Sequence, residues 1–119
     1  MQMNYEYPPV SILGSTGSVG EQAIDVAVKN GIRVNCLSAN RNVLRVEEQA
    51  RALGVRACAM ADADAAKDLQ VRLGDTSVKV YGGADGICEM ISAFEGDEVI
   101  SQMPSAPPYT FTEVSPRRT

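Results

Sequence analysis

The chain has 119 residues, of which 45% are hydrophobic and 22% are charged, so it is long enough for one small globular domain. Its net charge of -4 argues against a nucleic-acid-binding protein, and no apolar run approaches the roughly 20 residues of a membrane-spanning helix. It has no histidine, the commonest general base and zinc ligand, and residues 1–9 are not basic as a targeting peptide would be.

The first predicted strand, Val10–Gly14, runs directly into a turn that has a glycine at every third position up to Gly20. Glycine permits a tight backbone and lets main-chain N–H groups approach a pyrophosphate, and the helix that follows adds the positive end of its dipole. We therefore expect a nucleotide-binding turn, with a turn of purely structural role as the alternative. Four residues would offer their backbone amides, two of them also a hydroxyl: Thr16, Gly17, Ser18 and Val19.

The first predicted helix covers Ser18–Asn30, and Gly31 ends it. Ser18 and Glu21 have the spacing of a capping box, which would also occupy a carboxylate that otherwise repels phosphate. Residues spaced for a single apolar face follow: Val19, Ala23, Val26 and Ala27.

The second predicted strand, Ile32–Ala39, ends at the position whose residues distinguish an NAD site from an NADP site. An NAD site places a carboxylate there for the ribose 2′-hydroxyl, whereas no Asp or Glu occurs between Asp25 and Glu47. The guanidinium of Arg41 suits a 2′-phosphate instead, and Asn40 and Asn42 can supply amide donors. We therefore expect NADPH, the alternative being that Arg41 is a solvated surface charge. No Gly-Lys-Ser/Thr follows the glycines, which excludes a Walker loop.

The rest of the chain continues to alternate. Asn42 is expected to cap a helix that ends at Gly54, with Arg45, Glu47, Glu48 and Arg51 as its solvated face. The third predicted strand is Arg56–Ala61, and Asp62 and Asp64 open the helix after it. The fourth predicted strand, Ser77–Tyr81, is followed by a turn at Gly82-Gly83. Asp85 then opens the last helix, and a fifth strand begins at Asp97. This order predicts an α/β fold, a doubly wound parallel sheet of the Rossmann type, over residues 1–100.

Three cysteines lie far apart, at positions 36, 58 and 88. Their odd number and their spacing argue against disulfides and metal sites, so we expect reduced core residues of a cytoplasmic protein. Residues 101–119 hold four of the six prolines and show no periodicity, which indicates an irregular or disordered tail and an incomplete sheet.

Both cofactor motifs resemble the N-terminal NADPH domain of the 1-deoxy-D-xylulose-5-phosphate reductoisomerase family. The family reads roughly I-L-G-S-T-G-S-I-G and A-G-R/K-N-V, where this chain has I-L-G-S-T-G-S-V-G and A-N-R-N-V. The resemblance covers about residues 9–100. It implies that Thr16, Gly17, Ser18 and Val19 bind the pyrophosphate and that Arg41 and Asn42 contact the 2′-phosphate and ribose. Asn40 stands where the family usually has glycine, a position that asparagine can fill in a left-handed conformation.

The family implies an enzyme that rearranges 1-deoxy-D-xylulose 5-phosphate and reduces it with NADPH to 2-C-methyl-D-erythritol 4-phosphate, an isoprenoid precursor. Full-length members are expected to need Mg²⁺ or Mn²⁺ and to form homodimers. After the fifth strand this chain has Ser101-Gln102-Met103-Pro104 in place of an asparagine and a Gly/Ala-rich segment.

The metal ligands, the substrate-phosphate site and the C-terminal domain are therefore expected to be missing from this chain. We accordingly expect a truncated product that binds NADPH without turnover and contains no catalytic or metal-binding residues of its own. Two alternatives remain open from the residues: a fragment of another NADP-dependent reductase, and a stand-alone nucleotide-sensing module.

Overall fold

The computed structural model describes residues 8–101, in which nine helices and strands alternate strictly. They are β1 (Val10–Leu13), α1 (Ser18–Lys29), β2 (Val34–Ala39), α2 (Val43–Leu53), β3 (Ala57–Met60), α3 (Ala63–Arg72), β4 (Lys79–Gly82), α4 (Gly83–Ala93) and β5 (Glu98–Ser101). The tail expected over residues 101–119 lies outside the described residues except for Ser101, which ends β5.

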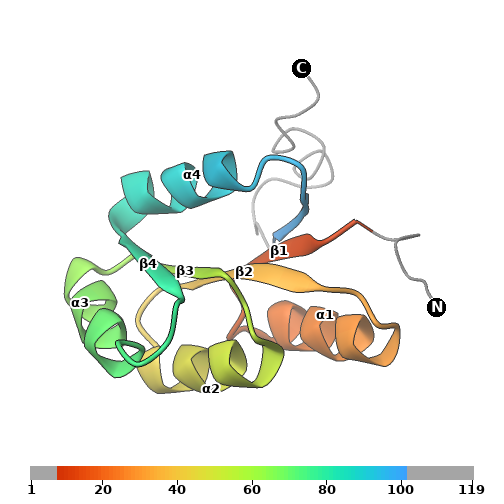
Figure 1. Ribbon diagram of the computed structural model, residues 1–119, viewed down its shortest axis with the longest axis horizontal. Coiled ribbons are helices and arrows are strands. Elements are labelled where there is room, and N and C mark those ends of the chain that lie inside the picture. The colour runs from red at the N-terminus through yellow and green to blue at the C-terminus, as the bar shows by residue number, and fades with distance from the viewer. Residues whose placement is uncertain (1–7, 102–119) are drawn as a thin grey trace.

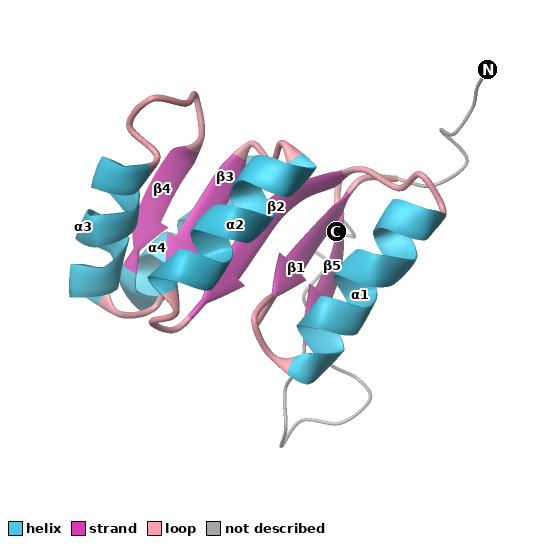
Figure 2. Cartoon of the chain, turned by 90° about the horizontal axis from the view of Figure 1, so that it is seen from below, coloured by secondary structure: helices cyan, strands magenta, loops and turns pink. Residues whose placement is uncertain are grey.

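The strands form one parallel sheet in the order β4-β3-β2-β1-β5. Crossovers between parallel strands are right-handed, so the helices of the run from β1 to β4 share a face, and α4, which returns across the sheet, lies on the other. Figures 1 and 2 show this arrangement, with α1, α2 and α3 on one side of the sheet and α4 on the opposite side. The predicted doubly wound α/β fold is confirmed.

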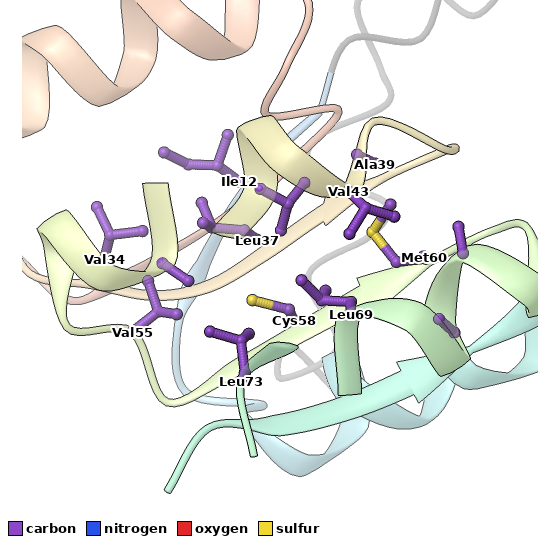
Figure 3. Close-up of a cluster of buried hydrophobic side chains, with 14 of the residues drawn as sticks. Ile12, Val34, Leu37, Ala39, Val43, Val55, Cys58, Met60, Leu69 and Leu73 are labelled. Atoms are coloured by element: carbon purple, nitrogen blue, oxygen red, sulfur yellow. The ribbon is translucent and has the colours of Figure 1, made fainter. Parts of the chain in front are cut away.

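Each face of the sheet has its own core. The larger core lies beneath α1, α2 and α3, and Ile12, Leu37 and Leu69 are completely buried in it (Figure 3). The smaller core forms where Met90 of α4 packs against Cys36, Ala57 and Ala59. The helical spacing of apolar residues predicts buried faces for these segments of α2 (Val43, Val46, Ala50 and Leu53) and α3 (Ala66, Leu69 and, at its C-cap, Leu73). All of these residues are buried except Leu53, which is partly buried, so periodicity identified the correct faces of the two helices.

The apolar face predicted for α1 is partly wrong. Val19 and Val26 are 43% and 53% exposed, whereas Gly20 and Ala27 are buried. The reason is the position of α1 over β1 and β5, at one edge of the described sheet, where its outer flank has no helix beside it (Figure 2). Val19 and Val26 therefore line an open groove of about 330 Å³ that also contains Ile32.

Two predictions about helix starts are also corrected: α1 begins at Ser18 as predicted but without the predicted capping box, and α4 begins before the predicted residue. Gly17 occupies the N-cap of α1 without any side-chain cap, so Ser18 and Glu21 form no capping box. Glu21 instead binds an arginine of the neighbouring helix α2, which sequence spacing could not show. Helix α4 begins at Gly83 rather than at Asp85, because Gly82 ends β4 and serves directly as the N-cap.

The cysteines do not all lie in the core. Cys36 and Cys58 are buried, and burial raises the pKa of both thiols to about 12. Cys88 is exposed, because Ile87 and Met90 turn the apolar face of α4 toward the sheet and leave the next position facing outward.

Alkylation should separate these thiols, because the thiolate is the reactive form and a high pKa suppresses it. We expect iodoacetamide at pH 8 to modify Cys88 in the folded protein and all three cysteines after unfolding in urea. Mass spectrometry of the intact protein and its peptides measures this. Modification of Cys36 at the rate of Cys88 under native conditions would contradict the burial described above.

Candidate nucleotide-binding site

The glycine turn lies at a topological switch point of the sheet. Strand β1 is paired with β2 on one side and with β5 on the other. The strands from β1 to β4 are added in order toward one edge of the sheet, and the chain then crosses back to place β5 on the other side of β1. In open parallel sheets, ligands bind beyond the carboxyl ends of the strands at this point. The turn that follows Leu13 therefore occupies the position where this fold binds nucleotides.

The turn and helix α1 are in direct backbone contact. Gly14 has a φ of +77°, which favours glycine, and its carbonyl accepts from the amide of Gly17 at 3.2 Å. A Cβ atom added to Gly20 would lie 2.1 Å from the Gly14 oxygen and 2.7 Å from the Cα atom of Ser15. Two of the three glycines are therefore explained by the structure: Gly14 by its backbone conformation and Gly20 by the lack of space for a side chain.

The start of the turn is anchored to the end of β2. The amides of Gly14 and Ser15 both donate to the carbonyl of Ser38, at 2.9 and 2.8 Å. The pairing of Leu13 with Ser38 continues the β1–β2 ladder to the same level. The turn and the segment after Ser38 are thus brought together by backbone bonds, as the two sequence motifs required.

A side chain of α2 completes this anchor. Gln49 is buried, accepts from the Ser15 hydroxyl at 2.8 Å and donates from Nε2 to the Ser15 carbonyl at 3.0 Å. Sequence reasoning did not identify Gln49 as a site residue. The available signal was its place on α2 between Val46 and Ala50, where a polar residue interrupts the apolar stripe.

Donor groups remain available at the start of α1. Within residues 8–101, the amides of Thr16, Ser18 and Val19 donate to no backbone or side-chain acceptor. The amide of Gly17, predicted as a fourth donor, is used inside the turn. Ser18 and Val19 are exposed and Thr16 is half-buried, so the three free N–H groups lie at the accessible end of a helix dipole, which is suited to a phosphate.

The second motif forms an exposed loop at the carboxyl end of β2. The Asn42 side chain caps α2 by accepting from the amide of Arg45 at 3.3 Å, and the Asn40 carbonyl accepts from the amide of Asp62. The carboxylate of Asp62 is itself occupied, because it caps α3 through the amide of Ala65 at 2.9 Å. Arg41 is exposed and pairs with no carboxylate of the described residues.

Glu21, the acidic residue in the first turn of α1, is paired with Arg45 and not with Arg41. Arg45 donates to both carboxylate oxygens of Glu21, at 2.8 and 2.6 Å, and to Glu48 at 2.7 Å. These bonds hold the pKa of Glu21 below its ordinary value, chiefly through the hydrogen bond to Arg45. The predicted solvated face of α2 thus includes a bridge to Glu21 of α1 as well as an ion pair between Glu47 and Arg51 within the helix.

Residues 8–101 contain no group of three His, Cys, Asp or Glu side chains that could hold a metal ion. None of the helices in this range is long and apolar enough to cross a membrane.

Comparison with known proteins relates this chain to a family. The family model for 1-deoxy-D-xylulose 5-phosphate reductoisomerase matches residues 10–108. The reductoisomerase of Acetivibrio thermocellus is 46% identical over 78 residues, which are 66% of this chain and 20% of the relative. That of Agathobacter rectalis is 38% identical over 93 residues, or 77% of this chain and 24% of the relative.

Solved structures give the same result. The reductoisomerase from Zymomonas mobilis in complex with NADPH is 33% identical, with a TM-score of 0.65 over 70% of this chain and 22% of that one. A structure of the reductoisomerase in complex with magnesium, 21% identical, shares the fold with a TM-score of 0.72 over 78% of this chain and 24% of the other. The chain thus spans about a quarter or less of the relatives it matches, and it belongs to the 1-deoxy-D-xylulose 5-phosphate reductoisomerase family.

Proposed function

We propose that this chain is the NADPH-binding N-terminal part of a 1-deoxy-D-xylulose 5-phosphate reductoisomerase. The observation that carries the proposal is one arrangement at the ends of the paired strands β1 and β2: free amides at the start of α1, after β1, and an arginine after β2 that pairs with no carboxylate of the described residues. A relative with the same fold has been solved with NADPH bound, which supports the same ligand here. The comparisons do not favour the alternatives of another reductase or a nucleotide-sensing module.

The residues of the site fit the two charged parts of this cofactor. The amides of Thr16, Ser18 and Val19 would bind the pyrophosphate, with Gly17 shaping the turn between them. Arg41 would bind the 2′-phosphate through charge-assisted hydrogen bonds. Asn40 and Asn42 would border the ribose, although the side chain of Asn42 already caps α2. When bound, NADPH would supply a hydride from its nicotinamide, and these residues would hold its pyrophosphate and its phosphorylated ribose in place.

The activity of the whole protein is part of the proposal. It would convert 1-deoxy-D-xylulose 5-phosphate, a sugar phosphate, to 2-C-methyl-D-erythritol 4-phosphate with NADPH and Mg²⁺ or Mn²⁺, as a cytoplasmic homodimer. We assign residues 1–100 to the cofactor domain. The described residues contain neither a metal cluster nor a histidine, so the metal and the sugar phosphate would bind other residues of the whole protein. By itself the 119-residue chain would bind the cofactor without reducing the substrate.

The proposal is tested by titrating the 119-residue chain with NADPH and with NADH. The 2′-phosphate adds hydrogen bonds between charged groups, which are typically strong enough to tighten binding by about 10- to 100-fold. We expect NADPH to bind more tightly by at least the lower factor, as measured by isothermal titration calorimetry. Equal affinity for the two cofactors would contradict the assignment of Arg41, and failure to bind either would contradict the cofactor site.

A further inference from the structure

Gln49 connects helix α2 to the glycine turn through two buried hydrogen bonds. Its Oε1 accepts from the Ser15 hydroxyl at 2.8 Å, and its Nε2 donates to the Ser15 carbonyl at 3.0 Å. The orientation of this amide is fixed chemically, because a carbonyl can only accept and therefore must face the NH₂ group. Ser15 is completely buried and Gln49 is 5% exposed, so water does not replace these bonds.

These bonds complete the partners of Ser15. Its amide donates to the carbonyl of Ser38, its hydroxyl donates to Gln49, and its carbonyl accepts from Gln49. Every polar atom of this residue is therefore directed toward β2 or α2. The side chain of Ser15 is consequently directed into the protein and away from the accessible start of α1.

The bond to the Ser15 carbonyl has a consequence for the next residue. The carbonyl of Ser15 and the N–H of Thr16 belong to the same planar peptide unit, in which a trans bond makes the two groups point in opposite directions. Gln49 holds that carbonyl toward α2, so the amide of Thr16 is turned away from α2. Of the four amides predicted to bind the pyrophosphate, it is one of the three that donate to no protein acceptor within residues 8–101.

We propose that Gln49 is a positioning residue for the pyrophosphate, acting through the peptide between Ser15 and Thr16. The inference rests on the proposed function, because it specifies how the same cofactor site is oriented. The loop that contains Arg41 directly precedes α2, so Gln49 also links the helix that follows this loop to the glycine turn. Arg45, one turn earlier on α2, reinforces this link through Glu21 of α1.

Gln49→Met tests the proposal, because methionine keeps the length of the side chain and removes both hydrogen bonds. The probes are NADPH and adenosine 2′-monophosphate, which has the 2′-phosphate but no pyrophosphate. In the full 119-residue chain we expect the Kd of NADPH to rise about tenfold, while that of adenosine 2′-monophosphate changes less than twofold. The ratio of the two constants is the readout, since a loss of stability alone would leave it unchanged.

Two further variants accompany this one. Gln70→Met makes the same substitution at an exposed position of α3 and should leave both constants unchanged. Ser15→Ala removes only the hydroxyl bond, so a selective loss of about threefold is expected, and it replaces Gln49→Met if that variant does not fold. If the wild type binds both probes and the ratio of the two constants is the same in Gln49→Met, the role of Gln49 is overturned and the proposed function is not. Binding of neither probe by the wild type overturns the proposed function and this inference together.

Discussion

Replacing Arg41 by glutamate is expected to weaken NADPH binding about 100-fold and to leave NADH binding within about threefold of the wild type. A guanidinium that donates to the 2′-phosphate contributes up to about 3 kcal/mol, and a carboxylate in the same place also repels the phosphate. NADH has no charge at this position and should be little affected. The preference for NADPH is therefore expected to disappear or reverse, as measured by fluorescence or calorimetric titration with both cofactors.

Arg33→Glu is the matched control for this prediction. Arg33 is also exposed, and its replacement by glutamate changes the net charge by the same amount, but it precedes β2 and so lies at the opposite end of that strand. Its variant should bind NADPH within about twofold of the wild type, because charges separated by more than a Debye length of about 8–10 Å are screened at ordinary ionic strength. A similar loss in both variants would indicate a general effect of net charge and would contradict a specific role of Arg41.

The sequence predicted the order and type of the elements well, for identifiable reasons. Glycines and capping residues mark most of the boundaries, as at Gly54, which ends α2 in a left-handed conformation, and at Asp62, which caps α3. Strands β2 and β3 are buried throughout, as is typical of central strands that helices cover on both faces, although β2 includes the polar residues Asn35 and Ser38. The glycine turn between β1 and α1 was predicted from its own residues, because a strand, a glycine turn and a helix in succession form a local unit.

What the sequence could not predict depends on contacts between distant segments. The bond between Glu21 and Arg45 joins residues 24 positions apart, and that between Ser15 and Gln49 joins residues 34 apart. The first depends on α1 and α2 lying on the same face of the sheet, and the second on α2 lying next to the glycine turn. The exposure of Val26 has the same origin, because periodicity identifies an apolar face without indicating whether another element covers it.

The tightest contact of the site leads to the largest expected effect on stability. In Gly20→Ala, the new methyl group would lie 2.1 Å from the carbonyl oxygen of Gly14, which is backbone and cannot rotate away. Helix α1 must then move off the turn or the turn must open. We expect the free energy of unfolding to fall by about 3 kcal/mol, an overpacking cost that exceeds the roughly 1 kcal/mol by which alanine favours a helix. Urea unfolding followed by circular dichroism measures the change.

Gly96→Ala distinguishes this steric effect from the general cost of replacing glycine. Gly96 is exposed, a Cβ atom added there meets no atom within 4 Å, and its φ lies outside the left-handed range. Its variant should unfold within about 0.5 kcal/mol of the wild type. The Gly20 variant should also lose NADPH affinity, since moving α1 displaces the amides of Ser18 and Val19 from the turn. Wild-type stability in Gly20→Ala would contradict the contact between α1 and the turn, on which the geometry of the whole site depends.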